Sequence, residues 1–423
     1  MQRKINTPAW VAGNTIYEVN LRQFTKEGTI KAFEEHLPRL KELGVGILWF
    51  MPIQPIGKKN RKGTLGSYYS ISDYKKVNPE FGTIDDFKSL VKKIHDLNMK
   101  VIIDWVANHT AWDHDWTVDH PEFYSKDENG NFKAPVEDWE DVIHLDYGNP
   151  DLWDTMISDM QFWINEAGID GFRCDMAHLV PTLFWNRARR DLDKIKPVYM
   201  LAESENFDLL EYAFDTIYNW KLMHAMNEVA AGTSHANQLG ETISNEFNYL
   251  PKGASFMNFT SNHDENSWQG SAIERIHYFL EPLTVLTFLI PGMPLIYSGQ
   301  EAGNYRRLKF FDKDEIEWKD DKMFELFQKL AELKGKLPNF SNKVEMRIVN
   351  SDASEKILCI ALFENDAKCL FLLNLSDKAV DFYVKCQQLE GPFRNAIQQE
   401  VKTGYSCHNQ FKLSAFGYLI LVK

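Results

Sequence analysis

The chain is poor in cysteine and has no excess of positive charge. Its 423 residues include five cysteines, an odd number without CxxC spacing, so neither a disulfide framework nor a zinc site is predicted. We expect these cysteines to be free thiols in a reducing compartment: Cys174, Cys359, Cys369, Cys386 and Cys407. Lysine and arginine number 47 against 60 aspartates and glutamates, and the net charge of −13 repels phosphate backbones and anionic lipid. Nucleic acid and membrane surfaces are therefore not expected as partners.

A long uninterrupted apolar run is also missing. The longest apolar stretch, Pro282 to Ser298, contains three prolines and predicts a buried helix, a turn and a strand rather than a membrane span. The first residues include basic side chains with no apolar segment behind them, so no signal peptide is predicted and a cytoplasmic location is expected. Nothing in the sequence indicates an oligomeric state.

Short apolar runs rich in β-branched residues alternate with longer segments of helical period, a pattern typical of repeated βα units. The expected strands are Thr15–Asn20, Gly46–Met51, Val101–Val106, Gly171–Asp175, Val198–Glu203, Phe214–Tyr218, Phe256–Thr260 and Met293–Tyr297. Eight parallel strands with helices between them predict the α/β fold class and a closed (β/α)8 TIM barrel. Among the helices, Ile30–Leu43 is expected to end at Gly44, and Ile84–Leu97 is expected to be a second amphipathic helix.

The pattern changes at two places along the chain. Residues 107–149, after the third strand, are rich in polar and aromatic residues with little periodicity, and a segment that long in a compact domain is usually functional. Residues 339–423 contain short alternating runs separated by turn residues, which predict an antiparallel β-sandwich. We therefore expect a catalytic barrel of residues 1–106 and 150–338, an inserted region of residues 107–149 and a C-terminal β-domain.

Carboxylates stand where several of the predicted strands end. Asp175, Glu203 and Asp264 close or follow the fourth, fifth and seventh strands, and the active site of such a barrel lies at these ends. Each carboxylate alone is more simply an ion pair or a helix N-cap, but their recurrence at successive strand ends favours one shared site. Arg173 and Asp175 share a strand face, so the guanidinium is expected to hold Asp175 ionised. Glu203 has no cation beside it in the sequence, so crowding by Asp175 and Asp264 is expected to raise its pKa and keep it protonated. An acid beside an ionised carboxylate is the arrangement of a retaining glycosidase.

Four segments carry a resemblance to a known family: Asp104-Trp-Val-Ala-Asn-His109, Gly171-Phe-Arg-Cys-Asp-Met-Ala-His178, Ala202-Glu203-Ser204 and Phe259-Thr-Ser-Asn-His-Asp264. In this order they resemble the signature regions of the alpha-amylase family, glycoside hydrolase family thirteen. Further similar motifs are Gly66-Ser-Tyr-Tyr69, Pro79-Glu-Phe-Gly82-Thr and Tyr297-Ser-Gly-Gln-Glu301. The resemblance extends from about Ile16 to Trp318, whereas the C-terminal part is similar to the family's β-domain only in position and pattern.

The resemblance implies roles for seven residues. It implies that Asp175 is the nucleophile, Glu203 the acid and base, and Asp264 a third carboxylate that grips sugar hydroxyls. The residues that it implies around them are Arg173 to orient the nucleophile, His109 and His263 to hydrogen-bond the sugar, and Tyr69 to stack beneath it. For either histidine alone, ordinary polar packing is an equal alternative, and Asp104 is expected to fix the third strand rather than react.

Two departures from the family pattern bear on binding. Ala177 stands where many amylases have the lysine that contacts the sugar on the leaving-group side. Val142-Ile-His144-Leu-Asp146 replaces the usual Pro-Asp-Leu, which removes an aspartate that often binds calcium. Asn108 and the His178 carbonyl match two calcium ligands of the family, but two oxygens fall short of the six to eight that calcium prefers. No cofactor is expected to be required, and a structural calcium ion is doubtful.

The expected function is an α-1,4-glucan hydrolase of the alpha-amylase type, acting on starch-like polysaccharides or maltooligosaccharides by double displacement. The alternatives within the family are a maltooligosaccharide- or cyclodextrin-degrading enzyme and an α-glucosyl transferase. A more distant alternative is a non-catalytic carbohydrate-binding protein on the same barrel, which is disfavoured because such proteins normally lose the catalytic carboxylates.

Overall fold

The structure is a computed structural model that describes residues 5–337, 344–364, 366–385, 393–397 and 410–423. Pro338, Cys386 and Cys407 lie outside the described residues. The described cysteines Cys174, Cys359 and Cys369 are free and buried, as expected. Within the described ranges, no helix is long and apolar enough to cross a bilayer.

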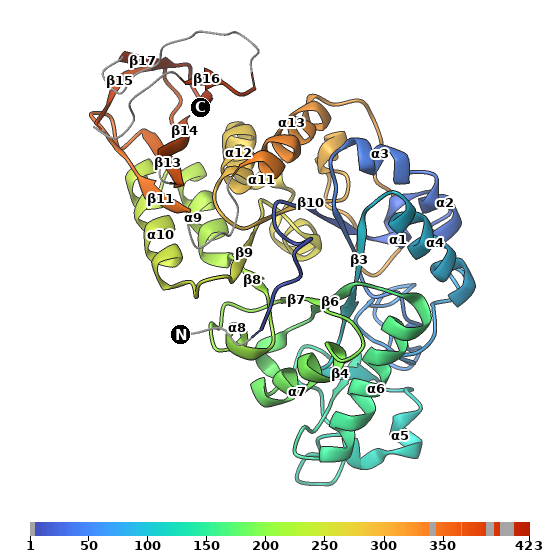
Figure 1. The fold of residues 1–423 in the computed structure, drawn as a ribbon. Helices are drawn as coiled ribbons and strands as arrows, with labels where there is room; N and C mark the ends of the chain where they lie inside the picture. Colours follow the sequence, from blue (N-terminus) through green and yellow to red (C-terminus); the bar gives the residue numbers. More distant parts are fainter. Residues whose placement is uncertain (1–4, 338–343, 365, 386–392, 398–409) are drawn as a thin grey trace.

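A closed parallel barrel forms the centre of the molecule (Figure 1). Its strands follow the order β1-β10-β9-β8-β7-β6-β3-β2 around the barrel. They are β1 (Ile16–Val19), β2 (Ile47–Phe50), β3 (Lys100–Trp105), β6 (Gly171–Cys174), β7 (Tyr199–Ala202), β8 (Thr216–Tyr218), β9 (Ser255–Asn258) and β10 (Met293–Tyr297). Each corresponds to one of the eight predicted strands, and the predicted TIM barrel is confirmed.

Strand register brings the polar strand ends to one level. Asp104 of β3 lies opposite Arg173 of β6, and Cys174 of β6 lies opposite Ala202 of β7. The next residues continue the ladder, because the Asp175 amide donates to the Trp105 carbonyl at 3.0 Å and the Glu203 amide donates to the Cys174 carbonyl at 3.0 Å. The parallel register thus places residues from distant segments at the same mouth of the barrel.

Helices surround the barrel and are capped by residues visible in the sequence. The longer helices are α4 (Ile84–Asp96), α6 (Pro150–Ala167), α7 (Thr182–Leu192), α9 (Trp220–Ala230), α10 (Ala236–Tyr249), α12 (Leu280–Leu289) and α13 (Lys322–Lys336). α4 begins at Thr83, whose hydroxyl accepts from the Asp86 amide while Asp86 returns the bond, a reciprocal capping box. α6 begins at Pro150 and ends at Gly168, whose φ of +72° is readily adopted by glycine.

The prediction of one continuous helix over Ile30–Leu43 is wrong. The structure has α2 (Ile30–Glu34) followed by α3 (Leu37–Glu42), with Pro38 in the first turn of α3. Proline lacks the amide hydrogen needed to continue the ladder and disfavours helical geometry at the preceding residue, so it fits the start of a new helix. The predicted buried face is nevertheless correct, since Phe33, Leu37 and Leu40 are all buried.

The inserted segment after β3 forms two short paired strands and two short helical turns. β4 (His109–Ala111) and β5 (Val142–His144) pair antiparallel, with His109 opposite His144. Between them lie the short helix α5 (Trp116–Asp119) and a 3-10 turn at Pro121–Phe123. Because β4 directly follows β3, the pairing holds His109 near the mouth of the barrel.

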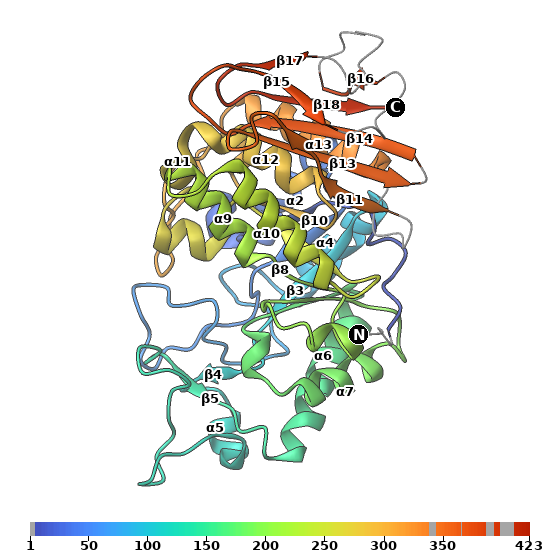
Figure 2. The same cartoon turned by 90° about the vertical axis from the view of Figure 1, so that its left-hand side faces the viewer.

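The C-terminal residues form antiparallel sheets, as predicted. One sheet has the order β11-β13-β14-β18-β16 and a smaller sheet has the order β12-β15-β17. Their strands are β11 (Glu345–Ile348), β12 (Asn350–Ser351), β13 (Ile357–Glu364), β14 (Asp366–Asn374), β15 (Val380–Lys385), β16 (Arg394–Asn395), β17 (Gln410–Leu413) and β18 (Tyr418–Val422). Figure 2 shows β14, β15, β17 and β18 above the helices α9 and α10.

The larger sheet contributes to two cores. Alternate residues of β13 face opposite ways: Leu358 and Ile360 join the barrel core, whereas Ile357 and Cys359 join a separate core with the smaller sheet. The sheet approaches α10 closely at Gly240, where a side-chain Cβ would come within 3.1 Å of Ile348 and 3.2 Å of Leu358. The barrel and this sheet therefore share one continuous hydrophobic core.

Candidate active site

Arg173 lies at the centre of the candidate site and joins three carboxylates. It is fully buried on β6, and its Nη1 lies 2.9 and 3.0 Å from the two oxygens of Asp104. The same nitrogen lies 3.2 Å from Asp175 Oδ1, and Nη2 lies 2.9 Å from Glu203 Oε2. The predicted contact between Arg173 and Asp175 is therefore present, and Asp104 is a buried positioning residue, as expected.

Glu203 does have a cation beside it, contrary to the sequence-based expectation. β6 and β7 are neighbouring parallel strands, so Arg173 reaches Glu203 across the sheet although the two are far apart in the chain. Glu203 Oε2 also accepts the Met176 amide at 2.8 Å. Met176 has a φ of +42°, a left-handed conformation that is uncommon for a side-chain-bearing residue. The chain therefore turns sharply after Asp175 and aims a backbone donor at the neighbouring carboxylate.

The expectation that Arg173 holds Asp175 ionised needs correction. Burial, and then the charge of nearby Glu203, raise the pKa of Asp175 well above its ordinary value, and Arg173 only partly opposes them. Burial likewise raises the pKa of Asp104 to about 6, against the same guanidinium. One cation shared by several carboxylates cannot keep them all ionised. Asp175 and Asp104 therefore keep a proton to higher pH than an exposed aspartate does.

Asp264 and His263 form the other half of the site. His263 Nδ1 lies 2.5 Å from Glu18 Oε1, and Nε2 lies 3.1 Å from Asp264 Oδ2. Burial would lower the pKa of His263, but these two carboxylates raise it well above its ordinary value. Burial similarly opposes ionisation of Asp264, but His263 brings the pKa of Asp264 below its usual range. The pair is therefore an imidazolium beside an ionised carboxylate.

Tyr69 connects the two halves of the site. Its hydroxyl lies 2.8 Å from His263 Nε2 and donates to Asp104 Oδ2 at 3.1 Å. Its ring is close to parallel with that of His263, with centroids 5.5 Å apart. His109 borders the same place, because its ring hydrogen-bonds the Tyr69 backbone carbonyl. Burial lowers the pKa of His109 to about 3, so this imidazole is neutral.

All seven residues predicted from the sequence are therefore gathered at one mouth of the barrel. The structure adds polar and aromatic residues that the sequence analysis missed. Glu18, fully buried on β1, holds His263 in place, and its only sequence signal is a charged residue inside an apolar strand. Tyr218 on β8 accepts the Arg173 Nε hydrogen at 3.0 Å, and the indole of Trp49 on β2 donates to Asp104 at 3.2 Å.

Two further aromatic residues stand at the rim. Trp268 is 50% exposed and donates a hydrogen bond to Asp264 from its indole. It lies in a π-helical turn, Glu265–Gln269, immediately after Asp264. Phe310 packs 5.4 Å from the Trp268 ring and lies nearly parallel to Tyr69 at 6.2 Å. Together these rings form an apolar wall beside the carboxylates, which suits the CH faces of a sugar.

Asn108, which matches one of the family's calcium ligands, contacts protein groups in this structure. The Asn108 side-chain amide lies 3.3 Å from His109 Nδ1, and the Asn108 carbonyl accepts the Leu145 amide at 3.1 Å. Asp146 is exposed and accepts the Gly148 amide at 2.9 Å. Across the described residues, no group of three or more His, Cys, Asp or Glu side chains is placed to hold a metal ion. The expectation that a structural calcium ion is doubtful stays a prediction.

Comparison with known proteins places this geometry in a family. The family model described as "Alpha amylase, catalytic domain" matches residues 13–139 and 136–336. "Alpha-amylase MalA" of Haloarcula japonica is 27% identical over 393 residues, which cover 88% of this chain and 57% of that protein, little more than half its length. "Maltogenic alpha-amylase" of Bacillus acidopullulyticus is 25% identical over 434 residues, covering 92% of this chain and 71% of that protein.

Solved structures agree over almost the whole chain. The noncanonic maltogenic alpha-amylase AmyB of Thermotoga neapolitana has a TM-score of 0.88 and 30% identity, covering 97% of this chain and 98% of its own. An alpha-amylase of Lactobacillus plantarum has a TM-score of 0.87 and 29% identity, covering 98% and 99%. The matched barrel, its strand-end carboxylates and these likenesses together show that the chain belongs to the alpha-amylase family of glycoside hydrolases.

Proposed function

We propose that the chain is a retaining α-glucan hydrolase that cleaves α-1,4-glucosidic bonds of starch-like polysaccharides or maltooligosaccharides. One observation carries this proposal: Asp175 and Glu203, from neighbouring strands, are bridged by the single buried guanidinium of Arg173 at 3.2 and 2.9 Å. Two neighbouring carboxyl groups, one acting as the acid and the other as the nucleophile, are the reacting groups of a double displacement.

In the first step, Glu203 donates its proton to the glycosidic oxygen while a carboxylate oxygen of Asp175 attacks the anomeric carbon. The bond to the leaving sugar breaks, and a covalent glycosyl ester forms on Asp175. In the second step, Glu203, now ionised, takes a proton from water, and the oxygen of that water displaces Asp175 from the anomeric carbon. The anomeric carbon is inverted twice, so the product keeps the α-configuration.

The surrounding residues position the sugar and stabilise charge. Asp264, kept ionised by His263, is suited to accept hydrogen bonds from sugar hydroxyls and to face the positive charge that develops on the ring. His263 and neutral His109 supply ring nitrogens for the bound sugar, and Tyr69 supplies an aromatic surface. Arg173 aligns Asp175 against Glu203.

The test is a product analysis with soluble starch, maltoheptaose and β-cyclodextrin. Release of mixed short maltooligosaccharides from starch, with the α-anomer appearing first in ¹H NMR spectra, is the expected result. Initial release of the β-anomer contradicts the retaining mechanism. Inertness toward all three substrates contradicts the proposal and favours the non-catalytic alternative.

A second candidate is a maltooligosaccharide- or cyclodextrin-degrading enzyme, or a glucosyl transferase of the same family. Similarity to two maltogenic alpha-amylases supports the first, and 28% identity over 333 residues to a 4-alpha-glucanotransferase of Thermotoga neapolitana supports the second. If β-cyclodextrin is opened faster than starch is cleaved, the chain is a cyclodextrin-degrading enzyme. If products longer than the substrate form, the chain is a glucosyl transferase.

We also propose a cytoplasmic location, which the buried free thiols support, and no nucleic-acid partner, which the net charge of −13 supports.

A further inference from the structure

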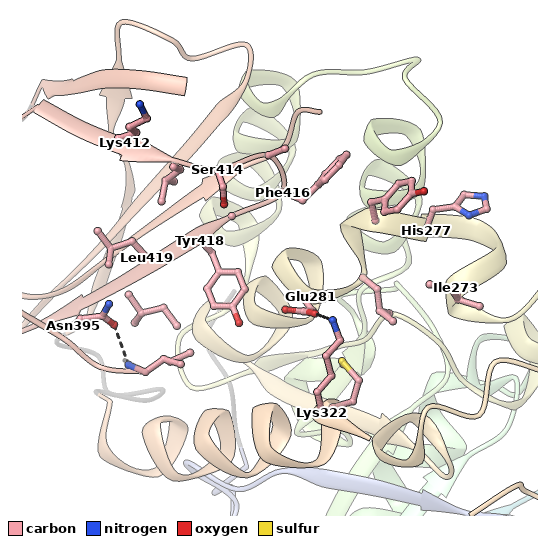
Figure 3. Close-up of a pocket in the computed structure, with 18 of the residues that line it drawn as sticks. Ile273, His277, Glu281, Lys322, Asn395, Lys412, Ser414, Phe416, Tyr418 and Leu419 are labelled. Carbon is pink, nitrogen blue, oxygen red and sulfur yellow. Dashed lines mark hydrogen bonds and ion pairs between the residues drawn. The ribbon is translucent and has the colours of Figure 1, made fainter. Parts of the chain in front are cut away.

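A groove of about 740 Å³ lies between the barrel and the C-terminal sheets, away from the strand-end carboxylates. One side consists of α11 (Ala272–Ile276), the following turn and the start of α12, together with Tyr305 and Lys322. The other side consists of β17, β18 and the turn between them (Figure 3). A cavity of about 20 Å³ shares Tyr305 with the groove and is lined by Ser261, three residues before Asp264. The groove is thus close to the active site but distinct from it.

Aromatic side chains border this groove from both sides. Tyr278 is 79% exposed, and its ring lies nearly parallel to that of Phe416, with centroids 5.4 Å apart. Tyr305 is 37% exposed on the barrel side, and Tyr418 extends from β18 into the groove (Figure 3). An aromatic ring as exposed as that of Tyr278 contributes little to the core, so packing does not explain it.

The backbone at the contact between Tyr278 and Phe416 is unusual. His277, next to Tyr278, has a φ of +38° and a ψ of −118°, and Phe416 has a φ of +55°. Residues other than glycine rarely adopt such conformations, which cost of order 1–3 kcal/mol each and cluster at ligand sites. Two strained positions thus hold the rings of Tyr278, from the barrel, and Phe416, from the sheet, against each other where the two sides of the groove meet.

The charged side chains of the groove have ion-pair partners. Glu281 and Lys322 form an ion pair across the barrel side, as Figure 3 shows. Lys412 is 71% exposed and lies 3.9 Å from Asp381. Burial, and then Glu281, raise the pKa of Tyr418 to about 12, so its hydroxyl stays a neutral donor. The groove therefore offers ring faces and hydroxyl groups, and each of its three charged side chains, Glu281, Lys322 and Lys412, has an ion-pair partner.

A ligand that matches this surface is neutral, bears many hydroxyls and has flat apolar faces. These are the properties of a pyranose chain, whose CH faces stack on aromatic rings while its hydroxyls bond to polar groups. An ionic ligand would have to displace the pair of Glu281 and Lys322, and a purely apolar ligand would leave the hydroxyls of Tyr305, Tyr418 and Ser414 without partners.

We propose that this groove is a second, non-catalytic α-glucan-binding site, centred on the stacked rings of Tyr278 and Phe416, that holds a distant part of the polymer cleaved at the barrel mouth. The proposal rests on the proposed function for the identity of the sugar. Binding of one chain at two places raises its effective concentration at the carboxylates. The site matters for long substrates only, because short oligosaccharides do not reach both places.

The test is affinity electrophoresis of the full chain in native gels that contain soluble starch. Asp175→Asn is the parent, so that starch is not consumed during the run. Adding Tyr278→Ala is expected to weaken starch binding about three- to tenfold, the size of one aromatic stacking contact. Adding Tyr278→Phe keeps the ring and should retain most of the binding. Tyr249→Ala, which removes a ring that is 73% exposed on α10, is the matched control and should change nothing.

The same substitutions in the active enzyme give a second readout. Tyr278→Ala should raise KM for starch and leave kcat/KM for maltotriose unchanged, which also shows that the variant is folded. Equal starch retardation of the parent and its Tyr278→Ala derivative overturns the proposal, as does a parent that starch does not retard. If the wild-type chain cleaves no glucan but its retardation still depends on Tyr278, the proposed hydrolysis fails and the binding site stands.

Discussion

The barrel mouth and the groove beneath the C-terminal sheet are built in opposite ways. At the mouth, buried ionic groups hold one another: Arg173 touches three carboxylates, and His263 lies between two more. In the groove, the rings of Tyr278 and Tyr305 are exposed, and Glu281 is paired with Lys322. Buried charges act on a reaction through their protonation and position, whereas exposed rings contribute only contact. We therefore expect the barrel mouth to govern kcat and its pH dependence. The groove should affect only the affinity for long chains.

The largest effect is expected from Asp175→Asn at the mouth. Removing the nucleophile should lower kcat on the order of 10⁴-fold on starch and maltotriose alike, because neither substrate avoids the covalent step. Steady-state kinetics measure the loss, and an unchanged circular dichroism spectrum shows that the fold remains. Asp119→Asn, at an exposed position of α5, is the control with the same chemical change. Retained activity in Asp175→Asn would contradict the role of Asp175 as nucleophile, and with it the expectation that the barrel mouth governs kcat.

Glu203→Gln sharpens the comparison by separating proton donation from binding. On starch, kcat should fall about 10²- to 10⁴-fold, because the leaving sugar needs a proton. On an activated aryl maltoside, whose leaving group needs none, formation of the glycosyl ester should be much less affected. Pre-steady-state release of the aryl group measures this step. Equal losses on both substrates would contradict the acid role, and the exposed Glu228→Gln should affect neither.

Glu18→Gln tests whether the ionic network at the mouth sets a pH limit. Glu18 and Asp264 raise the folded-state pKa of His263, so the imidazolium stabilises the fold fully below its unfolded pKa of about 6.5. This contribution is lost as pH rises through the raised pKa. Removing Glu18 lowers that pKa, so the alkaline fall of Tm should begin at lower pH in the variant.

Thermal unfolding measured from about pH 6 to pH 10 checks this shift. Glu301→Gln is the matched control, because Glu301 is also fully buried but pairs with Arg39 and Tyr17 instead of His263. It should lower Tm without moving the alkaline limb. An alkaline limb that stays in place in Glu18→Gln would show that His263 is not the titrating group.

The smallest effect is expected from metal removal, because no group of three or more His, Cys, Asp or Glu side chains in the described residues is placed to hold a metal ion. Prolonged dialysis against EDTA should change starch hydrolysis and Tm by less than about twofold and a few degrees, respectively. A large loss of either that added calcium restores would show that the donors around Asn108 bind the ion.

The barrel could be predicted from the sequence because its strands are buried on both faces and therefore appear as short apolar runs. The contact between Arg173 and Asp175 could be predicted because residues two apart share a strand face. Contacts between strands were harder to predict. Glu18 and His263 are 245 positions apart, and only the closure of the barrel brings β1 beside the residues that follow β9.

The errors have similar causes. Glu203 has no cation beside it in the sequence, but Arg173 reaches it from the neighbouring strand β6. The pKa of Asp175 was expected to follow its nearest cation, but burial is the larger influence. The break between α2 and α3 lies at Pro38, because proline starts a new helix more readily than it continues one.

The shared core has a consequence for engineering this chain. Because Leu358 and Ile360 pack into the barrel core and α10 meets the sheet at Gly240, deletion of the C-terminal strands would uncover an apolar helix surface rather than release an independent module. Such a truncation should aggregate. A chimera that takes these strands from a relative would require a small residue at position 240 and side chains on β11 and β13 that match the helices beneath them.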